Sequence, residues 1–345
     1  MKICVFVQST CGGAERMSIL ISKMLNKKHD ITIHAFGKEN LMQSFIGNEK
    51  LVFHQAPSAI DKFIGKARAI IKEEKPDVIF CSLMPLNWRL ALAAIGTKSK
   101  IVFRSDNYID TQSFSSKVRL FIAYKMADAV IAQTEEMRQG IIRQLHISPK
   151  KIFTIHNPID TEYIDSKIAG NSPFTGDYTN YVAVGRYAHE KGFDILIKAF
   201  NEVRKSIPNA KLHILGDYHY DLNLFEQLKG LVDEFGIKEH VNFAGYTSNP
   251  YIYMKHADCF VLSSRNEGLP NVLIEAQYCG TPAAAIKCRP IIERIIDEGN
   301  TGFLAMQEDY KGLADAMMKC KGLGRIKTTY KSGGEEDINS IFEAV

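Results

Sequence analysis

The stretch NYVAVGRYAHEKGFDILIKAF, residues 180–200, joins two different patterns of apolar residues. Its first six residues form a short, valine-containing apolar run, which is typical of a buried strand. From Phe193 onward, apolar residues recur every three or four positions, as on one face of a helix. A strand, a loop and a helix make up half of a β-α-β unit, so the stretch predicts a parallel sheet covered by helices.

The same alternation extends along the whole chain in both directions. Before this stretch, strands are predicted at residues 2–7, 30–36, 51–54, 77–82, 100–104, 129–132 and 151–155. The pattern restarts after Asn157, with strands predicted at residues 180–185, 211–216, 240–245, 258–263 and 282–286. Two such series predict an α/β protein of two Rossmann-like, doubly wound domains. We place the domains at residues 1–160 and 161–345, because segment 156–180 is rich in Asn, Asp, Gly and Pro.

Length and composition fit this prediction. A chain of 345 residues suits two domains of about 150 residues each. The first strand has too short an apolar run for a signal peptide, and no segment reaches the ~18 apolar residues of a transmembrane helix. The seven cysteines contain no C-x-x-C pair. They predict reduced thiols in the core and a cytoplasmic location.

Charge is divided unevenly between the two halves of the chain. Residues 1–165 contain 23 Lys and Arg against 16 Asp and Glu, whereas residues 166–345 contain 20 against 23. Segments 59–75 and 115–127 each combine lysines with apolar residues at helical spacing. We expect one of them to contact an anionic membrane surface or a lipid diphosphate, so the protein is expected to be cytoplasmic or peripheral on the inner face of the plasma membrane. The alternative is a helix packed on the sheet with its lysines in water. Nucleic acid is not expected, because the basic residues do not interleave with aromatics.

Candidate site residues follow the predicted strands, where open α/β sheets bind ligands. Arg186 and Lys191 flank the loop after residue 185 and suit a diphosphate, although solvated loop cations are the alternative. Glu267 precedes a predicted helix that contains Glu275. A helix N-terminus favours an anion, and carboxylates accept hydrogen bonds from vicinal diols. A nucleotide diphospho-sugar has both features; the alternative is two unrelated helix acids.

Two further strand ends carry candidate residues. Gly12 and Gly13 follow the first strand and allow close backbone approach, but they do not form the G-x-G-x-x-G of dinucleotide sites. A simple turn is the alternative there. Asp106 and Asn107 follow the strand at residues 100–104. The alternative role of Asp106 is a helix or turn cap.

Four motifs resemble one known family. GRYAHEKG at 185–192, EGLPNVLIE at 267–275, CGGAER at 11–16 and HNPID at 156–160 are similar to motifs of the retaining glycosyltransferases of family 4. This resemblance implies a GT-B fold, in which two Rossmann-like domains face a central cleft. It also implies that residues 1–160 bind the acceptor and residues 161–345 the nucleotide-sugar. The final helix is expected either within the second domain or packed back on the first.

The resemblance also implies residue roles. Arg186 and Lys191 would neutralise the leaving diphosphate, Glu275 would hold the ribose and Glu267 the donor sugar. The remaining donor-binding residues would be Gly12, Gly13, Gly268, Leu269, Asn271 and Val272. Loops 216–220 and 243–247 would lie near the base, and the acceptor-side candidates are Asp106, Asn107 and Glu15. The residues expected to take part in catalysis are Asp106, Glu267, Arg186 and Lys191.

The chain departs from the family pattern in two places. Asp106 stands where many relatives have a histidine, and Arg289-Pro290 stands where relatives usually have a glycine. No D-x-D motif and no His/Cys cluster with metal-ligand spacing is present in the sequence. We therefore expect metal-independent transfer, with no cofactor, because paired cations and a helix end can replace Mg²⁺ at a diphosphate.

The resulting hypothesis is a retaining hexosyl- or N-acetylhexosaminyltransferase. Its expected donor is a UDP-sugar such as UDP-GlcNAc, UDP-GalNAc, UDP-Glc or UDP-Gal. Its expected acceptor is a glycan, lipid-linked, in the synthesis of an O-antigen-type or capsule-type polysaccharide. Two alternatives remain open at this point: a non-catalytic sugar-nucleotide-binding partner of another transferase, and a GT-B nucleotide-sugar 2-epimerase.

Overall fold

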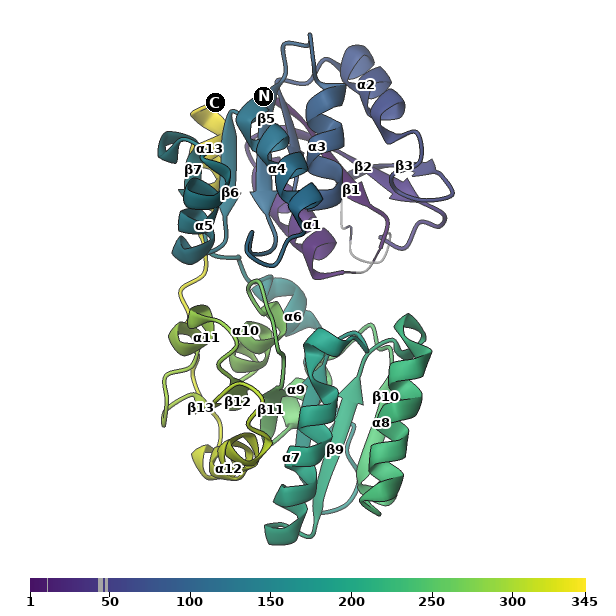
Figure 1. Ribbon diagram of the computed structural model, residues 1–345, viewed down its shortest axis with the longest axis vertical. Helices are drawn as coiled ribbons and strands as arrows, with labels where there is room; N and C mark the ends of the chain where they lie inside the picture. Colours follow the sequence, from purple (N-terminus) through teal and green to yellow (C-terminus); the bar gives the residue numbers. More distant parts are fainter. Residues whose placement is uncertain (11, 43–45, 47–48) are drawn as a thin grey trace. The chain divides into compact units, whose positions relative to one another are not determined.

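The chain folds into two compact units. The computed structural model describes residues 1–10, 12–42, 46 and 49–345, so Cys11 of the CGGAER motif lies outside the described residues. Unit 1 comprises Met1–Pro158 and Lys331–Val345, and unit 2 comprises Ile159–Tyr330 (Figure 1). Each unit contains a parallel sheet between helices, as the sequence predicts.

Within the described residues, the unit 1 sheet has seven strands in the order β3-β2-β1-β4-β5-β6-β7, all parallel. The strands are β1 (Lys2–Gln8), β2 (Asp30–Gly37), β3 (Lys50–Gln55), β4 (Val78–Cys81), β5 (Lys100–Ser105), β6 (Ala129–Ala132) and β7 (Ile152–Thr154). The helices are α1 (Gly13–Asn26), α2 (Phe63–Glu74), α3 (Met84–Ala93), α4 (Phe114–Met126), α5 (Glu135–Leu145), η1 (Pro149–Lys151) and α13 (Glu335–Glu343). All seven predicted strands of the first series are confirmed.

The alternation of side chains along the strands separates two cores in unit 1. One set of strand residues, including Phe6 and Phe103, packs under α2, α3, α4 and α5. The other set, including Val5 and Phe80, packs under α1 and α13. Because both faces of the sheet are buried, the strands are apolar almost throughout, as is typical of parallel sheets.

Within the described residues, the unit 2 sheet has six parallel strands in the order β10-β9-β8-β11-β12-β13. The strands are β8 (Thr179–Val184), β9 (Ala210–Leu215), β10 (Val241–Gly245), β11 (Cys259–Leu262), β12 (Ala283–Ile286) and β13 (Gly302–Ala305). The helices are α6 (Thr161–Lys167), α7 (Phe193–Ser206), α8 (Leu222–Glu234), α9 (Tyr251–His256), α10 (Asn271–Tyr278), α11 (Pro290–Ile295) and α12 (Tyr310–Cys320), with η2 (His189–Lys191), η3 (Tyr218–Tyr220), η4 (Lys238–His240) and η5 (Lys321–Leu323). Helices α7, α8 and α12 cover one face, and α6, α9, α10 and α11 cover the other.

The segments around the predicted boundary differ in detail from the sequence pattern. The division falls between Pro158 and Ile159, two residues before the predicted one. Helix α6 lies inside segment 156–180, where Asp160 caps it and Ile164 is buried. Residues 331–345 belong to unit 1, where α13 packs beside α1, so the final helix lies with the first unit.

The two basic amphipathic segments both contain helices. Helix α2 begins only at Phe63, after Lys62 in the left-handed conformation, so Ile60 precedes the helix. Helix α4 covers nearly all of segment 115–127. Across the part of the chain that the structure describes, no helix combines the length and apolarity needed to cross a bilayer.

Candidate active site

Strand order places two of the predicted loops side by side in unit 2. Strand β8 lies between β9 and β11, so the chain changes direction across the sheet at the β8–β11 pair. Ligands bind at such switch points, beyond the carboxyl ends of the strands. The loop after β8 carries Arg186 and Lys191, and the loop after β11 carries Glu267.

Lys191 and Glu267 form a direct ion pair between these loops. Lys191 Nζ lies 2.8 Å from Glu267 Oε1, and the two side chains are only 18% and 10% exposed. Ser264 Oγ donates a second hydrogen bond to the same oxygen at 2.6 Å. The sequence analysis assigns the two residues to phosphate and sugar separately, whereas the structure brings their charged groups into contact. The pair holds one cation and one acceptor at fixed positions.

The backbone around Lys191 holds this pair in place. Ser263 Oγ donates to the Lys191 carbonyl oxygen at 2.8 Å, and Arg265 N donates to the Glu190 carbonyl oxygen at 2.8 Å. Gly192 has φ +62°, and a Cβ there would collide with the Ser263 carbonyl oxygen. Only glycine lets the two loops approach this closely at such a φ.

Arg265 ties the same loops to α7. Its guanidinium donates to both carboxylate oxygens of Asp194 at 2.8 Å, and its Nε donates to Glu308 at 2.7 Å. Burial alone would raise the pKa of Asp194, but the hydrogen bonds and charge of Arg265 lower it below the ordinary value. A bidentate pair of this kind fixes orientation as well as distance.

Helix α10 carries Glu275 as its fifth residue, after Pro270 as the N-cap. The hydroxyl of Tyr251, on α9, donates to Glu275 Oε1 at 3.4 Å. The backbone of Gly268, Asn271 and Val272 lies around the helix start with partial exposure, and the Leu269 side chain is buried in the core. The start of α10 therefore lies in the same short stretch as Glu275; its role in binding a diphosphate stays a prediction.

Arg289, at one of the positions where the chain departs from the family pattern, contacts the loop that carries Glu267. Arg289 Nε donates to Asn266 Oδ1 at 2.9 Å. Asn266 directly precedes Glu267, so the arginine side chain supports the loop that carries the acid. Pro290 takes the first position of α11, where its missing N–H costs nothing.

The two loops expected near the base also adjoin each other. Gly216 N donates to the Gly245 carbonyl oxygen at 2.9 Å, which joins the segments after β9 and β10. Arg186 is exposed, and its guanidinium carbon lies 4.7 Å from the ring centroid of Tyr220. Arg186 thus lies beside the loop at 216–220, with a planar cation and an aromatic ring both accessible.

Unit 1 has its own switch point between β1 and β4, followed by the predicted glycines. Gly12 is the N-cap of α1, and Gly13 is the first helical residue. Thr10 Oγ1 donates to Glu15 Oε1 at 2.6 Å, and a Cβ at residue 12 would collide with Glu15 Oε2. The glycine therefore leaves room for a buried carboxylate at the helix start.

Asp106 follows β5 and is not a helix cap. Ser113 caps α4 instead, and Asn107 Oδ1 accepts from Tyr108 N at 2.8 Å. Among the described residues, Asp106 Oδ1 is buried without a hydrogen-bond partner. Burial raises the pKa of Asp106 to about 6; the charge of Arg104 opposes this and that of Glu15 adds to it. Asp106 and Glu15 are thus two acids at the carboxyl end of one sheet.

Both halves of the chain match models of known protein families. Residues 11–163 match the model of Glycosyltransferase Family 4, and residues 166–323 match that of Glycosyl transferases group 1. The chain belongs to the GT-B glycosyltransferases. The family prediction and the fold prediction are therefore confirmed.

Individual relatives resemble the glycosyltransferase over most of its length. An uncharacterized glycosyltransferase of Methanocaldococcus jannaschii is 28% identical over 78% of this chain and 71% of its own. The N-acetylgalactosamine-N,N'-diacetylbacillosaminyl-diphospho-undecaprenol 4-alpha-N-acetylgalactosaminyltransferase of Campylobacter jejuni is 24% identical over 96% and 93%. The crystal structure of Anabaena HepE in complex with UDP and glucose matches with a TM-score of 0.79 and 18% identity, over 100% of this chain and 98% of that one.

Sequence reasoning missed several residues that build the candidate site of the glycosyltransferase. Ser264 completes the Glu267 contacts, Ser263 and Arg265 hold the loops, and Tyr251 contacts Glu275. The first three directly follow β11, so the rule that ligands lie beyond strand ends could have indicated them. Tyr251 lies on a separate helix and left no signal in the sequence.

Proposed function

We propose that the protein is a retaining glycosyltransferase that uses a UDP-hexose or UDP-N-acetylhexosamine donor. We further propose a lipid-linked glycan acceptor in the synthesis of a bacterial surface polysaccharide. The observation that carries this proposal is the buried Lys191–Glu267 pair with Ser264, held at the β8–β11 switch point. It combines a fixed cation for a phosphate with a fixed acceptor for hydroxyls. The UDP in the HepE structure and the printed name of the Campylobacter relative support the choice of substrates.

In the proposed reaction, the cations stabilise the leaving diphosphate. Lys191 and Arg186 compensate the charge that develops on the phosphate oxygen as the anomeric C–O bond breaks. The acceptor hydroxyl oxygen bonds to the same face of the anomeric carbon, and its proton passes to the leaving phosphate oxygen. This order of steps retains the configuration of the anomeric carbon without a separate protein base. We propose that it also needs no metal ion.

Each acid is assigned a different set of hydroxyls. Glu267 accepts from donor-sugar hydroxyls through the oxygen that Lys191 and Ser264 do not occupy. Glu275, farther along α10, accepts from the ribose. The Arg186–Tyr220 stack lies beside the loop proposed to contact the base. In unit 1, Asp106, Asn107 and Glu15 are proposed to act on the acceptor side.

The exposed surface of α4 supports the proposal that the acceptor is lipid-linked. The helix exposes Phe114 (84%), Val118, Phe121 and Ile122, spaced along one side. Lys117, Arg119 and Lys125 accompany them, and residues 113–126 contain no acid. Exposed apolar side chains among lysines suit an anionic bilayer, so we propose peripheral membrane association through α4.

The proposal is tested with a panel of UDP-, GDP-, ADP- and dTDP-sugars, measured by thermal shift and by turnover with and without EDTA. We expect stabilisation by UDP-sugars only, unchanged by EDTA and lost in Glu275→Ala, but retained in Glu234→Ala. Glu234 is an exposed glutamate near the end of α8 and serves as the matched control. Slow donor hydrolysis is also expected.

Each alternative predicts a different result from the same panel. Donor binding without hydrolysis or transfer would favour a non-catalytic partner. Interconversion of the donor without acceptor would favour a 2-epimerase. The absence of stabilisation by any nucleotide-sugar would overturn the proposal.

A further inference from the structure

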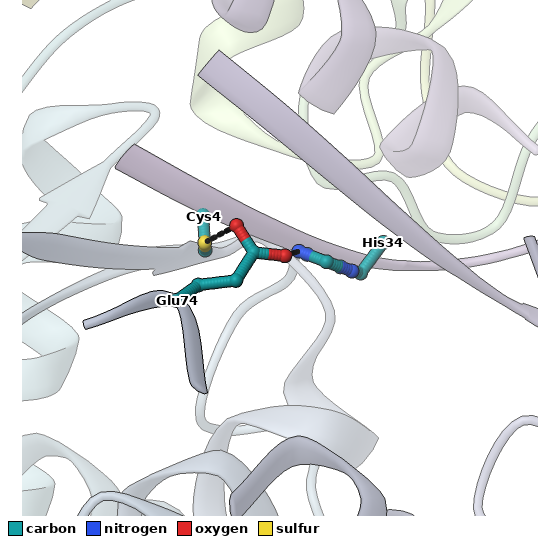
Figure 2. Close-up of side chains that lie close together, drawn as sticks. All are labelled: Cys4, His34 and Glu74. Carbon is teal, nitrogen blue, oxygen red and sulfur yellow. Dashed lines mark hydrogen bonds and ion pairs between the residues drawn. The ribbon is translucent and has the colours of Figure 1, made fainter. Parts of the chain in front are cut away.

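Three side chains with metal-binding atoms meet on one face of the unit 1 sheet. Cys4 is in β1, His34 is in β2 and Glu74 is the last residue of α2 (Figure 2). One ligand atom from each residue lies within 4.8 Å of the others. Cys4 and His34 are fully buried, and the Glu74 side chain is 20% exposed. The residues stand far apart in the sequence, so no local spacing reveals the cluster.

The parallel register explains why these residues converge. Cys4 pairs with Thr32, and Phe6 pairs with His34. Since alternate residues face the same side of a sheet, Cys4 and His34 both point toward the core that α2 covers. Glu74 reaches this core from the end of α2. The cluster lies toward the amino end of β1, whereas Gly12 and Glu15 follow its carboxyl end.

Two separations, one to each carboxylate oxygen of Glu74, are close to the ligand spacing around a small tetrahedral ion. Cys4 Sγ lies 3.5 Å from Glu74 Oε2, and His34 Nε2 lies 3.1 Å from Glu74 Oε1. Adjacent ligands of tetrahedral Zn²⁺ are roughly 3.3–3.6 Å apart, given Zn–S of about 2.3 Å and Zn–N or Zn–O of about 2.0–2.2 Å. Among the described residues, His34 Nε2 has no aligned hydrogen-bond partner, despite the nearby carboxylate. When Nδ1 of His34 is the protonated nitrogen, Nε2 presents its lone pair toward Glu74, as a metal ligand would.

A second layer of contacts orients the cluster. His34 Nδ1 lies 3.0 Å from His54 Nε2, and the two rings stack with centroids 5.3 Å apart. A ligating histidine generally uses its other ring nitrogen for such a hydrogen bond. Lys2 Nζ lies 3.1 Å from Glu74 Oε2 and 3.0 Å from the Glu74 carbonyl oxygen. Lys2 thus competes with any cation for the carboxylate.

We propose that Cys4, His34 and Glu74 form a Zn²⁺ site that joins β1, β2 and α2. A thiolate, an imidazole and a carboxylate are ligands of zinc, whereas Mg²⁺ and Ca²⁺ prefer oxygen alone. Binding replaces the thiol proton, which passes to solvent, and the two anionic ligands balance the charge of the ion. A water molecule fills the fourth position, reached from the exposed side of Glu74.

The first test measures stoichiometry and ligand identity on chelator-stripped full-length protein. Zn²⁺ is titrated against a chromophoric chelator, and Co²⁺ is substituted to detect thiolate-to-metal charge transfer. We expect one ion per chain and a charge-transfer band that disappears in Cys4→Ser. Cys81→Ser is the matched control, because Cys81 is also fully buried in a neighbouring strand, β4. It should retain the ion and the band.

Two variants at partly exposed positions keep the test decisive if Cys4→Ser does not fold. Glu74→Gln should weaken Zn²⁺ binding by at least about 10–100-fold, the loss seen even for outer partners of metal ligands. Lys2→Met should tighten binding, because it removes the competing cation. The proposal is overturned if the protein binds no stoichiometric Zn²⁺, or if Cys4→Ser and Cys81→Ser bind it equally. The cluster would then be only an ion-pair network with Lys2.

Discussion

At the scale of single residues, the Lys191–Glu267 pair sets the charge of the proposed donor site. Removing the lysine would leave a nearly buried carboxylate that accepts a hydrogen bond from the neutral hydroxyl of Ser264. A carboxylate at that place repels a diphosphate. We therefore expect Lys191→Met to lower kcat/KM by about 10²–10³-fold, the effect typical of losing one group that stabilises developing charge.

The measurement is steady-state transfer with the donor identified by the panel. Lys205→Met is the control, since Lys205 is an exposed lysine of α7 that pairs with Glu202. An unchanged kcat/KM in Lys191→Met would remove the pair from the proposed mechanism.

The raised pKa of Asp106 leads us to expect that the stability of the protein depends on pH. Burial raises its pKa to about 6 in the folded protein, above the ordinary value of 3.8. Between these two pH values the folded state holds more proton than the unfolded state, so stability falls as the pH rises from about 4 to 6. The change is on the order of 2 kcal/mol for one such group.

Asp106→Asn removes this titration. In urea unfolding, the variant should lose the wild-type decline over pH 4–6 and be the more stable protein above pH 6. Asp315→Asn, at an exposed position of α12, should keep the wild-type profile. Parallel profiles for wild type and Asp106→Asn would contradict the assignment.

The sequence predicts the positions of the candidate residues in the fold better than it predicts their contacts. All four lie in unit 2: Arg186, Lys191 and Glu267 follow the strands expected for them, and Glu275 lies in the expected helix. That Lys191 and Glu267 touch depends on β8 and β11 being neighbours, which a pattern of apolar runs does not specify. Likewise, a buried Asp106 depends on the packing around β5 rather than on local sequence.

At the scale of elements, Gly192 controls the turn between β8 and α7. Gly192→Ala places a methyl group against the Ser263 carbonyl at φ +62°. We expect it to destabilise unit 2 by about 1–3 kcal/mol and to weaken donor binding, because the loops that hold Lys191 must separate. Chemical denaturation and donor titration measure the two effects.

Gly230→Ala is the matched control for this substitution. Gly230 lies inside α8, and a Cβ there meets nothing within 4 Å. Alanine should stabilise that helix by about 0.5–1 kcal/mol without changing donor binding. Equal effects of the two substitutions would contradict the role given to Gly192.

Helix α4 predicts binding to anionic vesicles. The double variant Phe114→Ser/Phe121→Ser should lose most flotation with vesicles containing phosphatidylglycerol, because it removes two of the exposed apolar anchors. Binding should weaken with salt, since each nearby Lys or Arg contributes about 1 kcal/mol at an anionic surface. Leu222→Ser/Met306→Ser removes two exposed apolar residues from unit 2 and should float normally. Flotation equal to wild type in the α4 variant would exclude this surface.

Most elements are visible in the sequence, and the exceptions have physical reasons. Strand β13 has four residues and starts with a glycine, so no apolar run marks it. Helix α6 has seven residues and one buried side chain, Ile164, which is too little for periodicity to show. Helix α2 starts later than its apolar spacing indicates, because Lys62 takes a left-handed conformation.

At the scale of the whole molecule, the last fifteen residues complete the first unit. Ile338, Ile341 and Phe342 are buried with α1 residues and Phe80. Deleting residues 331–345 should destabilise unit 1 by several kcal/mol, since each such side chain contributes about 1.5–3 kcal/mol when fully buried. Hydrogen exchange should show lost protection in unit 1 and little change in unit 2. The point variant Glu336→Gln, at an exposed position of α13, is the control.

Because α13 follows unit 2 in the chain but packs in unit 1, it affects the order in which the two units can fold during synthesis on the ribosome. Unit 2 is inserted in the chain between β7 and α13, so all its residues emerge before the final helix does. Nascent domains usually complete their folding from the N-terminus onward. In this chain, all residues of unit 2 are synthesised before α13. Until α13 is made, one face of the unit 1 sheet lacks the helix that packs on it beside α1. A stalled or truncated nascent chain would therefore expose the apolar face beside α1, which makes premature termination a source of aggregation for this protein.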